Sequence, residues 1–79
     1  MGRKYPPLTC KEVKRILKAL GFAFHRHKGS HEHWKAVVDG QLRLVTVDCP
    51  KELFVPPLLS SMVRQSGYSI EDWHRQLNP

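Results

Sequence analysis

The stretch HEHWKAVVDGQLRLVTV, residues 31–47, decides the fold of this chain. Apolar and polar side chains alternate before and after Asp39-Gly40, a dipeptide that is a strong signal for a two-residue hairpin turn. The pattern predicts two antiparallel strands, over about His31–Val38 and Gln41–Val47. This hairpin is the centre from which the rest of the fold is built.

Period-two alternation assigns side chains to the two faces of the hairpin. Pairing across the turn sets His31 opposite Asp48 and Trp34 opposite Val45. One face then carries an apolar set suited to a core, and the other a polar set that includes two leucines. Either a bulge changes the register or these leucines contact a partner. The core face consists of Trp34, Ala36, Val38, Val45 and Val47, and the other face of His31, His33, Lys35, Asp48, Thr46, Leu44 and Leu42.

Another strand is predicted before the hairpin, from Phe22 to His27, where the alternation again has period two. Lys28-Gly29-Ser30 then turn the chain into the strand that His31 opens. The pattern places Phe22, Phe24 and Arg26 on one side and Ala23, His25 and His27 on the other. For Phe22, Phe24 and Trp34 we expect packing in the core.

Helices flank these strands in the sequence. Thr9-Cys10-Lys11-Glu12 matches a capping box, and Gly21 is suited to end the helix that follows. The apolar stripe of this helix is Val13, Ile16, Leu17 and Leu20. A second helix should begin at the prolines, Pro50 and Pro56-Pro57, and stop at Gly67; its stripe is Leu58, Leu59, Met62 and Val63. A short third helix has Ser69 as its cap and Ile70, Trp73 and Leu77 on one face.

The order of elements is therefore helix, three antiparallel strands, helix and a short terminal helix. We expect an α+β fold with the helices on one face of the sheet, in a single domain spanning residues 1–79. The other face of the sheet is left for function.

Charge and composition narrow the function classes. Lys and Arg number 13 against 7 Asp and Glu, a net charge of +6 that favours a polyanionic partner. No apolar run approaches the roughly 20 residues that cross a bilayer, and no apolar signal-peptide segment follows Met1. We expect a cytoplasmic protein without a membrane partner. Cys10 and Cys49 lack CxxC spacing and are expected to be reduced.

The segment Lys28-Gly29-Ser30-His31 has the residue types that RNA chemistry requires. Glycine lets the backbone approach a ligand closely, lysine binds phosphate, and histidine can move a proton near neutral pH. His31 is thus the first candidate for a functional residue.

Several segments together resemble the HicA family, small toxins of bacterial and archaeal toxin-antitoxin pairs whose fold is like a double-stranded RNA-binding domain. They are Leu20-Gly21-Phe22, the segment 26–31, the hairpin at Asp39-Gly40, Val45-Thr46-Val47 and the segment 63–69. The resemblance implies the toxin of a type II pair, a metal-independent endoribonuclease that cleaves mRNA. It also implies that His31 is the essential group and that a HicB-type antitoxin covers the active surface. Relatives often carry Val-Pro-x-His where this chain reads Val47-Asp48-Cys49-Pro50, so one histidine is missing here.

Neutral His31 is expected to accept the proton of an RNA 2′-hydroxyl, which attacks the adjacent phosphorus. Either His33 or His27 is available to protonate the leaving 5′-oxygen, and the sequence does not choose between them. No cofactor is expected. The predicted RNA-binding residues are Lys28, Gly29, Ser30, Arg26, His33 and Lys35.

Two other readings stay open from the sequence alone. In one, the protein binds RNA without cleaving it, and its basic residues follow phosphates. These would be Lys11, Lys14, Arg15, Lys18, Arg26, Lys28 and Lys35. In the other, His25, His27, His31 and His33 converge with Cys10 or Cys49 on a metal ion.

Overall fold

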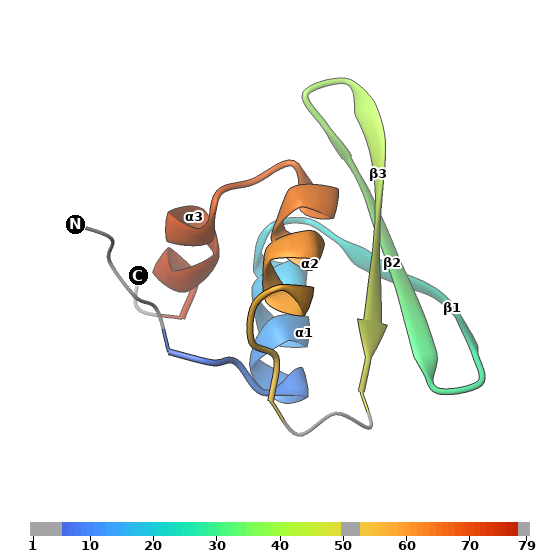
Figure 1. The fold of residues 1–79 in the computed structure, drawn as a ribbon. Helices are drawn as coiled ribbons and strands as arrows, with labels where there is room; N and C mark the ends of the chain where they lie inside the picture. The colour runs from blue at the N-terminus through green and yellow to red at the C-terminus, as the bar shows by residue number, and fades with distance from the viewer. Residues whose placement is uncertain (1–5, 50–52, 78–79) are drawn as a thin grey trace.

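The computed structural model describes residues 6–49 and 53–77, and it confirms the α+β class and the predicted order of elements. All three helices lie on one side of a three-stranded antiparallel sheet of order β1-β2-β3 (Figure 1). The elements are α1 (Cys10–Ala19), β1 (Ala23–Lys28), β2 (His31–Val38), β3 (Gln41–Asp48), α2 (Leu58–Ser66) and α3 (Ile70–Arg75). No helix in the described ranges is long and apolar enough to span a membrane.

The helix ends follow the signals in the sequence. The Thr9 side chain accepts a hydrogen bond from the Glu12 amide at 3.1 Å, and the Glu12 carboxylate accepts one from the Thr9 amide at 2.9 Å, which completes the capping box. Ser69 caps α3 in the same way. Gly67 ends α2 with a φ of 81°, a left-handed conformation that favours glycine. The prediction that Pro50 helps to start α2 lies outside the described residues; α2 itself begins after Pro57.

The core lies between the helices and the inner face of the sheet. The stripe of α1 is fully buried at Val13, Ile16 and Leu17, in one buried cluster with Trp34 of β2 and Val45 of β3. Burial of these apolar side chains is the main stabilising contribution to the fold. The buried cluster also includes Leu8, Phe22, Val38, Val47, Phe54, Leu59, Met62, Val63 and Trp73.

The pairing of β2 with β3 confirms the predicted register without a shift, including His31 with Asp48 and Trp34 with Val45. In β1 the predicted pattern is wrong beyond Phe24, because a bulge lies between Phe24 and Arg26. The extra residue moves Arg26 to the opposite face from Phe24. Such an irregularity depends on how the edge strand pairs, which the local pattern does not report.

The expectation for Phe24 was also wrong. Its side chain is half exposed, and its ring forms a T-shaped pair with the Trp34 ring at a centroid distance of 5.8 Å. Phe24 lies on an edge strand, all of whose residues are exposed, so no helix covers it. Phe22 and Trp34 are buried as predicted.

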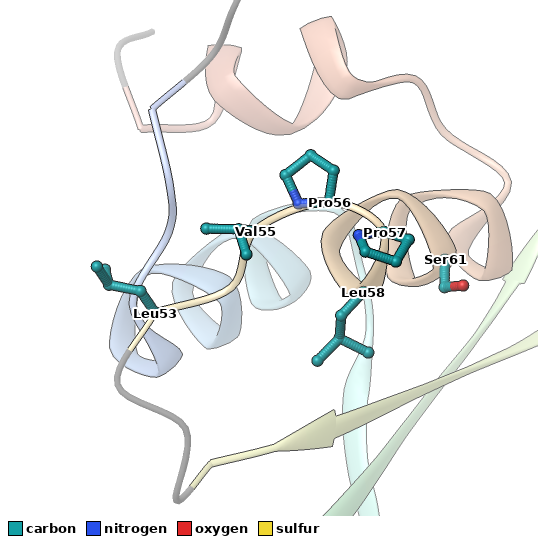
Figure 2. A pocket seen from close by; sticks show the side chains of 6 residues that line it. All are labelled: Leu53, Val55, Pro56, Pro57, Leu58 and Ser61. Carbon is teal, nitrogen blue, oxygen red and sulfur yellow. The ribbon is translucent and has the colours of Figure 1, made fainter.

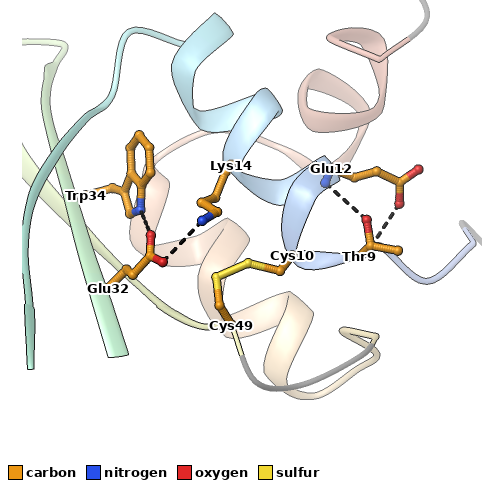
Figure 3. Close-up of a disulfide and its surroundings, with 7 residues drawn as sticks. All are labelled: Thr9, Cys10, Glu12, Lys14, Glu32, Trp34 and Cys49. Atoms are coloured by element: carbon orange, nitrogen blue, oxygen red, sulfur yellow. Dashed lines mark hydrogen bonds and ion pairs between the residues drawn. A yellow bond between two sulfur atoms is a disulfide. The ribbon is translucent and has the colours of Figure 1, made fainter. Parts of the chain in front are cut away.

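Cys10 and Cys49 form a disulfide, so the expectation that both are reduced was wrong (Figure 3). The bond joins the first residue of α1 to the residue that follows β3. Spacing along the sequence could not reveal it, because the fold brings together residues that are 39 positions apart. The helix–sheet unit is therefore closed covalently.

Candidate nucleic-acid interface

The side of the sheet turned away from the helices, called the outer face below, carries the predicted site residues in rows. Residues that pair across antiparallel strands share a face. Lys28 pairs with His31, and His31 pairs with Asp48, so a cation, a histidine and a carboxylate form the first row. The hairpin turn with Gly29 and Ser30 adjoins this row.

The second row consists of Arg26, His33 and Thr46, again through direct pairing. The Nδ1 atom of His33 lies 3.1 Å from the Thr46 hydroxyl, which fixes the imidazole on the outer face. Gln65 of α2 accepts a hydrogen bond from the Thr46 amide at 3.2 Å, so α2 holds this part of β3. The alternation placed Thr46 on this face but gave it no role, because a strand pattern does not report which side chains form hydrogen bonds.

The third row is Ala23, Lys35 and Leu44. Thus five of the predicted RNA-binding or catalytic side chains share the outer face, and the bulge in β1 is the reason that Arg26 is among them. They are Lys28, Arg26, His31, His33 and Lys35.

Positive charge concentrates at this face. The Lys35 ammonium is the largest cause that lowers the pKa of His25, with smaller contributions from desolvation and from the charges of Arg26 and His33. His25 occupies the bulge and is solvent exposed. The positive electrostatic potential that disfavours protonation of His25 also attracts the negatively charged phosphates of a nucleic acid.

His31 is accessible to a macromolecular substrate. Its side chain is 54% exposed, and its Nε2 atom lies 4.0 Å from Oδ2 of Asp48. The preceding turn requires a left-handed residue at Gly29, with a φ of 60°, and a Cβ built there meets nothing within 4 Å. Glycine is therefore needed here for the backbone conformation.

The structure separates other candidates from this face. His27 pairs with Glu32, and Glu32 in turn pairs with the buried Val47. His27 therefore lies on the inner side of the sheet, which faces the helices. Of the two histidines left open as proton donors, His33 shares the face of His31 and His27 does not. The hypothesis of a metal site with Cys10 or Cys49 as a ligand is not supported, because both sulfur atoms are joined in the disulfide. Within residues 6–49 and 53–77, no group of three or more His, Cys, Asp or Glu is arranged to hold a metal ion.

The basic residues of α1 belong to the helical side. Lys14 forms an ion pair with Glu32 at 3.2 Å, and Glu32 also accepts a hydrogen bond from the Trp34 indole (Figure 3). The Lys18 ammonium lies 5.9 Å from the Trp34 ring centroid, a cation–π contact. The seven cations proposed for a non-catalytic module thus divide between two sides of the sheet.

An apolar hollow opens at the start of α2, lined by residues of that helix and of the segment before it (Figure 2). Among the described residues that line it, Ser61 has the single side-chain hydroxyl and none is charged, so these residues offer no charged group for proton transfer. Its lining consists of Leu53, Val55, Pro56, Pro57, Leu58 and Ser61.

A family model described as the HicA toxin of bacterial toxin-antitoxin matches residues 10–68, from the start of α1 to just beyond α2. That match covers more than half of the 79 residues. The chain belongs to the HicA toxin family. This HicA-family toxin matches no curated protein. Its α3, which packs Trp73 into the core, follows the matched region.

Proposed function

We propose that this HicA-family toxin is a metal-independent endoribonuclease that cleaves mRNA, with His31 as the catalytic base. The observation that carries the proposal is the first row of the outer face. There an exposed histidine lies between a lysine and a carboxylate, beside a glycine turn and on an open sheet. Substrate RNA can reach His31 without any movement of the helices.

The chemistry follows from the groups present. The free imidazole nitrogen of His31 takes the 2′-hydroxyl proton, the 2′-oxygen bonds to phosphorus, and the bond to the 5′-oxygen breaks. The products are a 2′,3′-cyclic phosphate and a 5′-hydroxyl. Lys28, paired directly with His31, stabilises the crowded anionic phosphorane. His33 is the proposed donor of the proton to the 5′-oxygen.

RNA is held by its phosphates. The outer face carries one cationic side chain in each of its three rows, from Lys28, Arg26 and Lys35 in that order. The turn adds the backbone amides of Gly29 and Ser30. Such contacts supply affinity without sequence preference. We place this activity in the cytoplasm, where mRNA lies.

A HicB-type antitoxin is the proposed protein partner. Leu42 and Leu44 keep their predicted register and are 69% and 47% exposed, and Val37, which pairs with Leu42, is 71% exposed. These three residues, called the apolar patch below, begin beside Lys35 at Leu44 and continue the outer face beyond it through the pair of Val37 and Leu42. The proposed antitoxin covers the patch and extends along the same face over His31, and this contact would explain why the leucines are apolar.

The proposal is tested with purified full-length chain and a synthetic RNA in the presence of EDTA. Wild type is expected to cleave the RNA to cyclic-phosphate ends and to leave the matching all-deoxy oligonucleotide intact, because DNA lacks the 2′-hydroxyl. His31→Ala should lose cleavage while keeping its circular dichroism spectrum. His27→Ala removes an exposed histidine from the inner side of the same hairpin and serves as the comparison.

Equal cleavage by wild type and folded His31→Ala would refute the assignment. RNA binding of equal strength in both, with no cleavage by either, would instead select a non-catalytic RNA-binding module. Cleavage that requires a divalent ion would contradict metal independence.

A further inference from the structure

We propose that Asp48 is the positioning residue of His31: its carboxylate selects which imidazole nitrogen faces the RNA and supports the positive charge that His31 gains. This inference rests on the proposed function. It goes beyond that function by giving a role to a residue of β3 to which the sequence pattern assigned none.

The contact is set by the register of the hairpin. Asp48 is the direct partner of His31 in the ladder, and Oδ2 lies 4.0 Å from the His31 Nε2 atom. The Asp48 side chain is 28% exposed, about half as accessible as that of His31. Catalytic hydrogen bonds are often long in the absence of substrate and tighten when it binds, and we expect the same of this pair.

The second oxygen of the Asp48 carboxylate supports a functional role for this residue. Oδ1 of Asp48 is buried and has no hydrogen-bond partner among the described residues. A buried acceptor without a partner costs about 1–3 kcal/mol, and such groups are rare in folded proteins. Within the described residues, the carboxylate next to His31 therefore has one buried oxygen that no hydrogen bond satisfies.

The backbone of Asp48 is fixed on both sides. Val47 before it is fully buried in the core, and Cys49 after it is joined by the disulfide to Cys10 of α1. The backbone that carries the carboxylate is consequently held in place by the core and by the disulfide. A rigid orienting group is what a proton-transfer site requires.

The hydrogen-bonding chemistry of the Asp48 carboxylate decides the tautomer of His31. A carboxylate only accepts hydrogen bonds, so the Nε2 atom that faces it carries the proton and Nδ1 keeps its lone pair. Nδ1 then takes the 2′-hydroxyl proton, and the ring becomes an imidazolium with protons on both nitrogens. Asp48 stays ionised throughout and stabilises this cation.

Asp48→Asn tests the proposal in the RNA cleavage assay, with Glu71→Gln as the matched control. Glu71 is exposed on α3, and its substitution removes the same charge away from the outer face. We expect kcat of Asp48→Asn to fall by at least about tenfold. KM should stay the same or fall, because a negative charge near the RNA phosphates has been removed. Glu71→Gln should match wild type in kcat.

The pair Asp48→Glu and Asp48→Gln separates orientation from folding, since the two side chains have nearly the same size and differ in charge. With equal melting temperatures, higher kcat in Asp48→Glu than in Asp48→Gln supports the proposal. Equal kcat in the two, or wild-type kcat in Asp48→Asn, overturns it. His31→Ala is measured in parallel: if it cleaves RNA, the proposed function has failed, whereas its inactivity beside a fully active Asp48→Asn refutes only the role of Asp48.

Discussion

Ser66 connects α2 and α3 through a single buried hydroxyl. It donates to the Val63 carbonyl at 2.6 Å and accepts from the Trp73 indole at 3.0 Å and from the Tyr68 amide at 3.1 Å. Ser66 and Trp73 are both fully buried. The hydroxyl therefore satisfies the buried Trp73 indole N–H together with the Tyr68 amide.

Ser66→Ala should lower the free energy of unfolding by about 1–3 kcal/mol, because the Trp73 N–H is left buried without a partner. Urea denaturation followed by tryptophan fluorescence measures the change. Ser60→Ala, on the exposed side of the same helix, is the control and should be neutral or slightly stabilising. A Ser66→Ala protein as stable as Ser60→Ala would contradict the network.

Lys28 is expected to act on RNA affinity through phosphate contact. In a His31→Ala background, which prevents cleavage, Lys28→Gln should weaken binding and reduce the slope of log K against log salt concentration by about 0.7. Fluorescence anisotropy at several salt concentrations gives both quantities. Lys11→Gln, on the helical side, should change the slope less, and an equal change would place the RNA elsewhere.

At the scale of elements, the helix caps and the periodicity of apolar residues could be predicted, because each depends on residues that are close in the sequence. The Thr9 capping box, the Asp39-Gly40 turn and the register of β2 with β3 all follow from side chains close in sequence. The bulge in β1, and with it the face of Arg26, depends on pairing at a sheet edge. The exposure of Phe24 could not be predicted either, because no pattern along the sequence shows that the helices leave this edge strand exposed to solvent.

The disulfide should stabilise the union of α1 with β3. Closing a loop between residues 39 positions apart contributes about 4 kcal/mol in the chain-entropy model. Cys10→Ser and Cys49→Ser should each lower the unfolding free energy of the oxidised protein toward that of reduced wild type. Denaturation with and without dithiothreitol measures this, and wild type that is insensitive to reductant would contradict the prediction.

The apolar patch gives a prediction about assembly. Leu42→Ser combined with Val37→Ser should weaken binding to the HicB-type antitoxin far more than it changes the free energy of unfolding, since both side chains are mostly exposed. Calorimetric titration and urea denaturation of the same variant give the two values. Loss of stability with unchanged antitoxin affinity would mean that the patch supports folding instead.

For the whole molecule, stability should depend on pH through His74 on α3. Desolvation lowers the pKa of His74 below its ordinary value of 6.5, and the charge of Glu12 opposes this only in part. As pH falls below about 6.5, the unfolded chain binds a proton that the folded chain does not, so stability is present above that value and lost below it. The lowered pKa of exposed His25 acts in the same direction.

His74→Gln should therefore show a smaller loss of unfolding free energy than wild type between pH 7 and pH 5. Urea titrations at a series of pH values measure the slope for each protein. Identical slopes for the two would show that the burial of His74 does not contribute to acid sensitivity.

The global arrangement was largely predictable, because the hairpin in residues 31–47 fixes which side chains meet the helices. The position of His31 on the outer face followed from the same alternation. The surroundings of His31 did not: the burial of the Asp48 Oδ1 atom and the hydrogen bonds that Thr46 makes to His33 and Gln65 arise only when the strands and α2 are assembled.

The central claim is that the outer face of this toxin destroys mRNA through His31. Its most direct test is induced expression of wild type and His31→Ala at equal protein levels, with mRNA integrity followed over time. We predict rapid loss of full-length mRNA and growth arrest for wild type alone. Equal mRNA loss in cells expressing His31→Ala would contradict the account.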